Sequence, residues 1–184
     1  MSSPTPSEPQ STGAAALLTL RMLVASLLAV PIFLIVAMSF VLGTADDALA
    51  LTGLLLAPLI LGLAVHGVCE VVGYRMPATA PGTPRDSAED QSREAFLAKT
   101  ILRFALCESV MIVSMAAGFV VSEGGFAIFL VGAVVAEGLL WWHCWPDDRV
   151  LTRCQESLER EGGQSFLREA YGLPPSGGGA IKEL

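Results

Sequence analysis

The residues in this sequence that could do chemistry are ionisable groups placed inside apolar segments. Arg103 and Glu108 interrupt the apolar stretch ILRFALCESVMIVSM, residues 101–115. An ionisable side chain in hydrocarbon costs at least about 2.5 kcal/mol, so such groups face a bundle interior, pair with one another or reach the interface. Four further groups stand inside apolar segments in the same way: Arg21, His66, Glu70 and Glu137. We expect these six residues to form a buried ionisable network.

The depth of each group follows from its distance along the chain, at about 1.5 Å per helical residue. Glu108, Glu137 and His66 each lie eight or nine residues inside the end of an apolar segment, roughly 12–13 Å deep. These three are therefore expected at one level. Glu70 and Arg103 are expected to share a second level, one turn closer to the same end.

Partners within the network follow from these levels. Arg103 and Glu108 are five residues apart, about 140° around a helix, so they should not bond each other. Glu70 is the expected partner of Arg103, and Arg21 is the expected partner of Glu108 or Glu137. Two carboxylates beside one arginine leave surplus negative charge, so one glutamate is expected to hold a proton. Structural ion pairs and a working proton or ligand site both remain open interpretations.

A metal or haem site is a further alternative. His66, Cys69 and Glu70 have the spacing i, i+3, i+4, which presents nitrogen, sulfur and oxygen donors on one helix face. Counting places His143 roughly 9 Å shallower than His66, which argues against a haem held between the two. We therefore assign no metal site and no cofactor. The residues that would hold a metal are His66, Cys69, Cys107 and His143, with Glu108 and Cys144 beside them.

The elements that must position these groups are membrane-spanning helices. The chain of 184 residues is 53% hydrophobic and only 16% charged, whereas a soluble domain keeps about a quarter of its residues charged. A span needs about 20 apolar residues. Four stretches qualify: about Ala14–Leu42, Asp47–Tyr74, Thr100–Val121 and Phe126–Trp145. The expected fold is an all-α four-helix bundle of two transmembrane hairpins, residues 14–146.

The orientation follows from the basic residues. Nine of them lie in the segment 75–99 and in the tail after residue 147, whereas the short loops 43–46 and 122–125 contain none. The positive-inside rule then puts the middle loop and both termini in the cytoplasm, with the bundle in the cell membrane. The four cysteines lie in or beside apolar stretches, so a secretory disulfide framework is not expected.

The segments outside the spans have their own patterns. Residues 1–13 and 175–184 have the composition of disordered tails. Ser87, followed by Asp90, is the expected N-cap of a polar helix that leads into the third span. Residues 147–174 are expected to form cytoplasmic amphipathic helices. Their two apolar stripes are Val150, Leu151, Cys154 and Leu158, then Phe166, Leu167, Ala170 and Tyr171.

Two resemblances cover parts of the chain. The segment AKTILRFALCESVMIVSMAAGFVV, within residues 98–121, resembles the outer helix of the proteolipid c subunit of F-type ATP synthases, which implies an ion-binding carboxylate at Glu108. The helix before it lacks the close-spaced glycines of that family, so a rotor subunit is not expected. The order of ILRFAL, a glutamate, a further span and WPDDRV is similar to small uncharacterised bacterial four-span membrane proteins. TLRMLVAS also resembles ILRFALCES, a weak internal repeat that aligns Arg21 with Arg103.

Composition and motifs limit the function classes. The net charge of −7 argues against nucleic-acid binding, and the sequence has no nucleotide-binding loop or nucleophile–base arrangement, so an enzyme is not expected. The first hypothesis is a non-enzymatic accessory or assembly subunit of a membrane complex. The second is a small proton-linked transporter or channel that uses Glu108 and Glu137. The third is a metal- or haem-binding membrane protein. The expected partners are the lipid bilayer and other membrane subunits, or a second copy of the chain.

Overall fold

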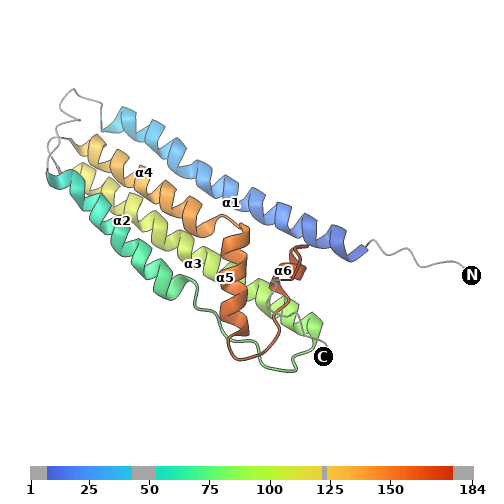
Figure 1. Cartoon of the computed structure of the whole chain (residues 1–184). Coiled ribbons are helices and arrows are strands. Elements are labelled where there is room, and N and C mark those ends of the chain that lie inside the picture. The colour runs from blue at the N-terminus through green and yellow to red at the C-terminus, as the bar shows by residue number, and fades with distance from the viewer. Residues whose placement is uncertain (1–7, 43–52, 122–123, 176–184) are drawn as a thin grey trace, which may run out of the picture. The chain divides into compact units, whose positions relative to one another are not determined.

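Every regular element in the described part of the chain is a helix. The computed structural model describes residues 8–42, 53–121 and 124–175 (Figure 1). The helices are α1 (Glu8–Val41), η2 (Gly53–Leu55), α2 (Leu56–Val68), η3 (Cys69–Gly73), α3 (Arg85–Val120), α4 (Gly125–Cys144), α5 (Asp148–Glu159) and α6 (Leu167–Ala170). Four helical segments are long and apolar enough to cross a membrane: α1, the continuous run η2–α2–η3, α3 and α4.

The chain divides into two compact units. The first, which we call the bundle unit, contains Val24–Tyr74 and Lys99–Trp145. The second, which we call the tail unit, contains Met1–Leu23, Arg75–Ala98 and Pro146–Leu184. The long helices α1 and α3 each contribute residues to both units.

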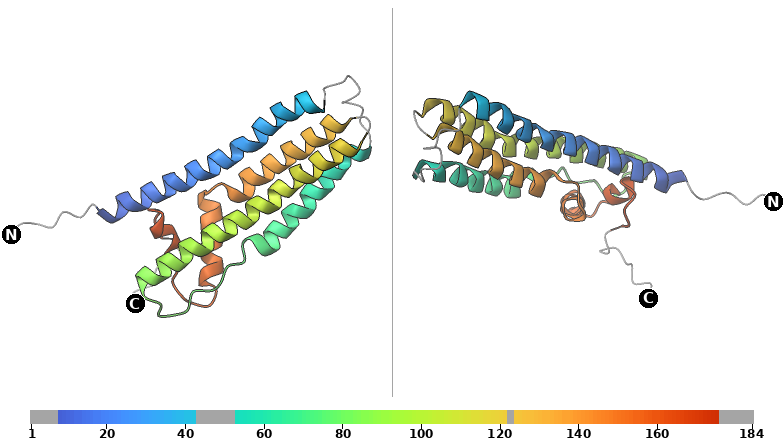
Figure 2. Two further views of the ribbon diagram at one scale, coloured as in Figure 1. Left: turned by 180° about the vertical axis from the view of Figure 1, so that it is seen from behind. Right: turned by 90° about the horizontal axis from the view of Figure 1, so that it is seen from above.

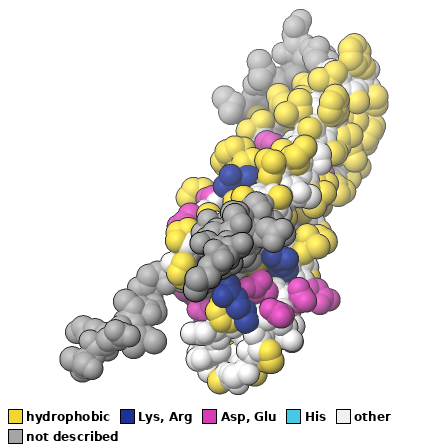
Figure 3. Space-filling view, turned by 90° about the vertical axis from the view of Figure 1, so that its right-hand side faces the viewer, with side chains coloured by type: hydrophobic (Ala, Val, Ile, Leu, Met, Phe, Trp, Pro, Cys, Tyr) yellow, Lys and Arg dark blue, Asp and Glu magenta, His cyan; other side chains and the backbone are white. Residues whose placement is uncertain are grey.

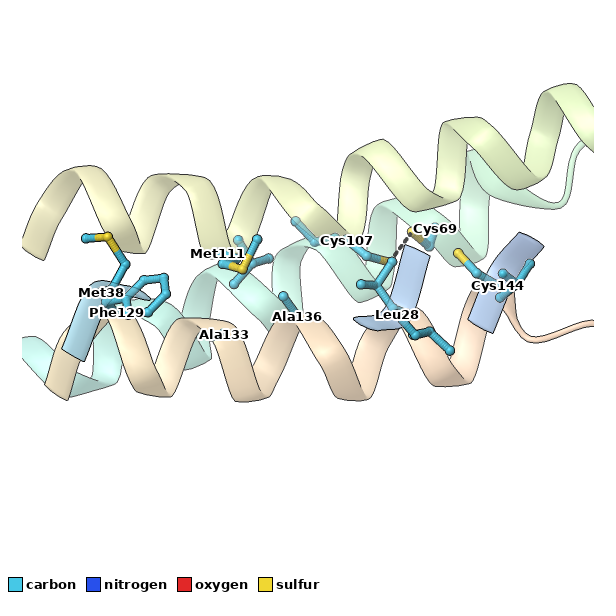
Figure 4. Close-up of a cluster of buried hydrophobic side chains, with 13 residues drawn as sticks. Leu28, Met38, Cys69, Cys107, Met111, Phe129, Ala133, Ala136 and Cys144 are labelled. Atoms are coloured by element: carbon cyan, nitrogen blue, oxygen red, sulfur yellow. Dashed lines mark hydrogen bonds between the residues drawn. The ribbon is translucent and has the colours of Figure 1, made fainter. Parts of the chain in front are cut away.

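Small residues allow close packing between the helices of the bundle unit, which run side by side (Figures 1 and 2). Gly132 on α4 faces the side chain of Ser114 on α3, and Gly62 on α2 faces Val135 on α4. A Cβ atom at either glycine would overlap its neighbour. Close approach of this kind is typical of helix interfaces in membranes. The core between the helices includes Leu28, Met38, Met111, Phe129, Ala133 and Ala136 (Figure 4).

The outer surface of the bundle unit carries large apolar side chains. Phe40, Leu63 and Val120 are 85%, 72% and 87% exposed. Hydrophobic side chains form a continuous area on the face seen in Figure 3. A contiguous exposed apolar area of this kind is rare on water-soluble proteins and is expected of helices that face lipid.

The tail unit is built around the amphipathic helix α5. The side chain of Asp147 caps this helix by accepting from the Val150 N–H at 2.8 Å. The first predicted stripe is buried on it: Val150, Leu151, Cys154 and Leu158. The Thr79 N–H donates to the carbonyl of Leu158 at 2.8 Å, which ties the segment before α3 to the end of α5. Of the second stripe, Leu167, Ala170 and Tyr171 are buried.

Side chains near the start of α3 hold the last segment of the tail unit. The Ser92 hydroxyl donates to the carbonyl of Ser165 at 2.9 Å, and Arg93 donates to the carbonyl of Ala170 at 2.7 Å. The ring of Phe96 packs against that of Tyr171, with centroids 5.7 Å apart.

Two helix starts differ from the sequence prediction. Residues 8–13 belong to α1 and not to a disordered tail; Pro9 is compatible with this because the first helical turn needs no N–H from it. The helix α3 begins at Arg85, where the Ala88 N–H bonds to the carbonyl of Pro84, so Ser87 is not the N-cap. The non-helical part of the middle loop is thus confined to residues 74–84. The predicted loop 43–46, the predicted start of the second span and residues 176–184 lie outside the described residues.

Candidate functional site

The candidate site lies in the bundle unit, where a π-helical turn follows α2. This turn, η3, continues α2 through Cys69–Gly73. A π turn changes the angular spacing of side chains and is frequent at functional sites. His66, Glu70 and Tyr74 all come from this stretch, and the last turn of α4 brings His143 to them.

Two histidines and a tyrosine form a continuous hydrogen-bonded group. The Nδ1 atom of His66 lies 2.9 Å from Nε2 of His143. On the other side of the same ring, Nδ1 of His143 lies 3.1 Å from the hydroxyl of Tyr74. The His143 side chain is fully buried. Its Nε2 atom has His66 as a neighbour, and its Nδ1 atom has Tyr74.

Glu70 adds a carboxylate to this group. Its Oε1 atom lies 3.9 Å from Nδ1 of His143, and the carboxylate is 31% exposed. One donor atom each from His66, Glu70 and His143 lies within 4.8 Å of the others. Within residues 8–42, 53–121 and 124–175, this is the one set of His, Cys, Asp or Glu side chains that could hold a metal ion with three ligands. We call it the His–Glu–His site.

Arg103 lies beside the site as a fully buried cation. Its guanidinium donates to the carbonyl of Gly73 at 3.1 Å and to the hydroxyl of Thr100 at 3.0 Å. The same group stacks over the ring of Tyr74, 4.7 Å from the centroid. Gly73 leaves the room for this, because a Cβ atom there would lie 2.8 Å from Cγ of Arg103. Arg103 therefore fixes both the end of η3 and the tyrosine that reaches His143. Its predicted pairing with Glu70 stays a prediction.

Three buried thiols lie next to the site. The Sγ atoms of Cys69 and Cys107 are 3.9 Å apart, and Cys144 is buried in the same core. Figure 4 shows these three side chains at one end of the bundle core. All three cysteines are free.

The remaining ionisable residues are arranged differently from the prediction. Glu108 on α3 and Glu137 on α4 are both partly buried in the bundle unit. Arg21 was expected to be buried, but its side chain is exposed and belongs to the tail unit. The residues of α1 up to Leu23 group with the tail unit and not with the bundle unit, where the carboxylates lie. Its pairing with Glu108 or Glu137 stays a prediction.

The predicted depth of His143 is wrong. Counting put His143 roughly 9 Å shallower than His66 and His66 level with Glu137, but the two histidine rings are in hydrogen-bond contact. The count assumed that Tyr74 and Trp145 mark the same depth. Tyr74 instead bonds to His143, so α2 with η3 extends further than α4 at this end.

Tyr74 is the functional residue that the sequence analysis missed. In the sequence it served only as the end of the second predicted span. Tyr74 follows Glu70 by four residues and His66 by eight, so in a helix all three lie on one face. This spacing could have placed Tyr74 beside His66 and Glu70.

The chain matches no protein-family model, no curated protein and no solved structure. The resemblances noted in the sequence stay expectations, and the site has to be interpreted from its own chemistry.

Proposed function

We propose that this chain is a multi-pass membrane protein that binds a divalent transition-metal ion at His66, Glu70 and His143. The observation that carries the proposal is the convergence of three donor atoms within 4.8 Å of one another. They come from two helices, 77 positions apart in the chain for the two histidines. The proposal is for binding and does not include catalysis.

The donor set indicates which ions suit the site. Two imidazoles with one carboxylate are a common ligand set for zinc, and with open positions they also suit iron(II) and related ions. Bonds from zinc to a histidine nitrogen or a carboxylate oxygen are generally about 2.0–2.2 Å long. The 2.9 Å separation between the ring nitrogens of His66 and His143 is shorter than two such bonds joined at a tetrahedral angle would give. A small rotation of either ring would therefore open the space for an ion.

Supporting residues around the site favour metal binding. A ligating histidine is normally oriented by a hydrogen bond to its other ring nitrogen. Tyr74 provides this contact to Nδ1 of His143, which leaves Nε2 directed toward His66. Arg103 in turn stacks on the ring of Tyr74. Polar groups in a membrane-spanning region are costly, and retaining this many in one place is typical of a functional site.

Metal titration of the purified full chain in detergent tests the proposal. The chain has two histidines and both belong to the site, so a protein without a histidine tag reports imidazole ligation from this site alone. We expect one cobalt(II) or zinc(II) ion per chain, with a cobalt spectrum of nitrogen and oxygen ligation. His143→Phe should remove binding.

Glu70→Gln and Glu108→Gln form a matched pair of variants. Both glutamates are partly buried in the bundle unit, but only Glu70 belongs to the site. Glu70→Gln should weaken binding by at least about tenfold, whereas Glu108→Gln should leave it unchanged. Equal loss in the two variants, or no metal bound by the unaltered chain, would contradict the proposal.

A second candidate function is that of an accessory or assembly subunit in which the polar group is structural. The observation that favours it is the internal hydrogen bonding of the group, from Thr100 and Gly73 through Arg103. A buried polar network of this kind can fix the register of a bundle. In that case the unaltered chain would bind no metal and would co-purify with other membrane proteins in mild detergent.

A further inference from the structure

We infer that Cys69 and Cys107 are a redox-active pair of thiols, which a small two-electron oxidant such as hydrogen peroxide converts reversibly to a disulfide. The inference goes beyond the proposed function and does not depend on it. Cys69 is the first residue of η3, and Cys107 lies on α3. The disulfide therefore joins two of the membrane-spanning segments within the bundle unit.

The two sulfur atoms are direct neighbours in the core of the bundle unit. Sγ of Cys69 lies 3.9 Å from Sγ of Cys107, and the two side chains are directed toward one another (Figure 4). Both residues are fully buried, and both are free thiols. They are 38 positions apart in the chain, so the packing of η3 against α3 brings them together.

The gap between the sulfurs is small enough to close. A disulfide has a sulfur–sulfur distance of about 2.05 Å, so the two atoms must approach by about 1.9 Å. A rotation of roughly 30° about a Cα–Cβ bond moves a cysteine sulfur by about 0.9 Å. Rotations of this size in both side chains, directed toward one another, supply most of the approach.

The oxidation balances with hydrogen peroxide as the oxidant. One thiol gives up its proton, and its sulfur attacks a peroxide oxygen. The O–O bond breaks, a sulfenic acid forms, and the other oxygen leaves as hydroxide and takes up the proton as water. The second sulfur then attacks the sulfenic sulfur, so that an S–S bond forms, the S–O bond breaks, and the hydroxide leaves with the second thiol proton as water. The thiols lose two electrons and the peroxide gains them.

The position of Cys69 gives such an oxidant an approach. Cys69 lies directly before Glu70, whose carboxylate is 31% exposed, and three residues after His66. The polar His–Glu–His site thus reaches from the surface of the bundle unit to the residue beside Cys69. Hydrogen peroxide is small and uncharged, so it does not bear the cost that keeps ions out of a membrane-spanning region.

Reversibility follows from the chemistry of the bond. A dithiol such as dithiothreitol returns the pair to free thiols by thiol–disulfide exchange and is itself oxidised to a disulfide. Disulfides of proteins in contact with a reducing cytoplasm are usually transient, and many of them sense the redox state. The free thiols of the structure are then the resting form, and the disulfide is the oxidised form.

Peptide mapping of the unaltered full chain in detergent tests the inference. The reduced chain is treated with hydrogen peroxide and a metal chelator, then unfolded and alkylated. The chain has four cysteines, so the reduced protein should take up four alkyl groups and the oxidised protein two. We expect mass spectrometry to find Cys69 joined to Cys107, and dithiothreitol to restore four alkylated residues.

Oxidation of the unfolded chain is the control for the role of the fold. In a chain unfolded by detergent and urea, the shortest loop between cysteines is the one from Cys144 to Cys154, which are ten positions apart. Loop closure then favours that pair, because the cost of bringing two residues together grows with the length of chain between them. The pairing of Cys69 with Cys107 should therefore dominate only in the folded chain.

Variants identify the two sulfurs. Cys107→Ala should abolish the disulfide of Cys69. Cys154→Ala is the matched control, because Cys154 is also a buried free cysteine but lies on α5 in the tail unit, and this variant should form the disulfide as the unaltered chain does. Mapping of the unaltered chain does not depend on how a variant folds. Four alkyl groups after peroxide treatment, a disulfide to Cys144 in place of this pair, or the same pairing in folded and unfolded chains would overturn the inference.

Discussion

His66 and His143 lie 77 positions apart in the chain, and Nδ1 of the first is 2.9 Å from Nε2 of the second. Two such nitrogens can share one proton or bind one metal ion, but they cannot both carry a proton at this distance without repulsion. The arrangement therefore fixes the ring orientation of His143, whose Nδ1 atom faces Tyr74. The geometry of the site therefore involves Tyr74 as well as the histidine pair.

Tyr74→Phe should weaken metal binding without abolishing it. The change removes the hydroxyl that lies 3.1 Å from Nδ1 of His143, and loss of such a supporting contact typically costs about 10–100-fold in metal affinity. The chain should also lose about 1 kcal/mol of stability. The other tyrosine supplies the control: Tyr171→Phe lies in the tail unit and should bind cobalt(II) like the unaltered chain. Unchanged affinity in Tyr74→Phe would mean that Tyr74 does not orient the ligand.

Gly132→Ala and Gly138→Ala should have opposite effects on thermal stability. Both glycines lie on α4, but a Cβ atom at Gly132 would overlap Ser114, whereas one at Gly138 would meet nothing within 4 Å. Overpacking typically costs about 1–3 kcal/mol, and glycine to alanine in an open helical position gains up to about 1 kcal/mol. The melting temperature in detergent should fall for the first variant and rise for the second. Equal shifts would mean that α3 and α4 do not pack closely at Ser114.

The existence of the long helices could be predicted from sequence because their apolar residues run for whole spans. Their ends could not. Residues 8–13 are polar and proline-containing, like a disordered tail, yet they continue α1 because this helix packs within the tail unit, where Gly13 contacts the backbone of Gly172. The start of α3 was missed by three residues for a similar reason: the polar segment after Arg85 is fixed by contacts such as Ser92 with Ser165, which only the folded chain reveals.

The candidate site could be predicted in its residue types but not in its geometry. The cost of burying charge pointed correctly to Arg103, which is fully buried. The relative height of two helices, however, depends on how their ends pack, and sequence counting has no access to it. This is why His143 was placed away from His66, and why Arg21 was placed inside the bundle although its side chain is exposed.

A double-mutant cycle tests the predicted pair of Arg103 and Glu70. Arg103→Leu removes the donor to Gly73 and Thr100 and should destabilise the bundle by about 3 kcal/mol. If the guanidinium also neutralises the negative charge of Glu70, the double variant with Glu70→Leu should recover much of the lost stability. Chemical denaturation in mixed micelles measures the coupling free energy. Arg21→Leu is the control with an exposed arginine, and it should change stability by less than about 0.5 kcal/mol. Strict additivity of the two single changes would exclude the pair.

Cysteine labelling tests the predicted orientation. Ser122→Cys, in the predicted external loop, should react with a membrane-impermeant maleimide in intact cells, and Ser87→Cys should react only after the cells are opened. The physical reason is the distribution of basic residues, which lie mostly in residues 75–99 and in the C-terminal tail and are absent from the two short predicted loops. Ser87 is exposed, so its reactivity reports the side of the membrane and not burial in the fold. The native cysteines are buried and should give a low background. Reaction of Ser87→Cys in intact cells would reverse the orientation.

Alkaline pH should destabilise the tail unit through Tyr171. Burial raises the pKa of the Tyr171 phenol, and the nearby charge of Arg93 lowers it by a smaller amount. The side chain is 7% exposed, with its ring against Phe96. The unfolded chain loses this proton near its ordinary pKa of about 10, whereas the folded chain still holds it. The folded state then binds more protons, so the contribution to stability is complete below about pH 10 and is lost as the pH rises toward the raised value.

Tyr171→Phe should remove this loss. Its melting temperature should fall less steeply than that of the unaltered chain between about pH 10 and 11, because phenylalanine has no proton to release. The near-ultraviolet absorbance of tyrosinate provides a direct measurement, since the chain has two tyrosines and the variant keeps only Tyr74. The transition that disappears from the titration of the folded chain is that of Tyr171, and it should lie above the value for free tyrosine. If the two proteins lose stability with the same slope, the phenol of Tyr171 already reaches water in the folded chain, and the packing of Tyr171 against Phe96 is too loose to exclude it.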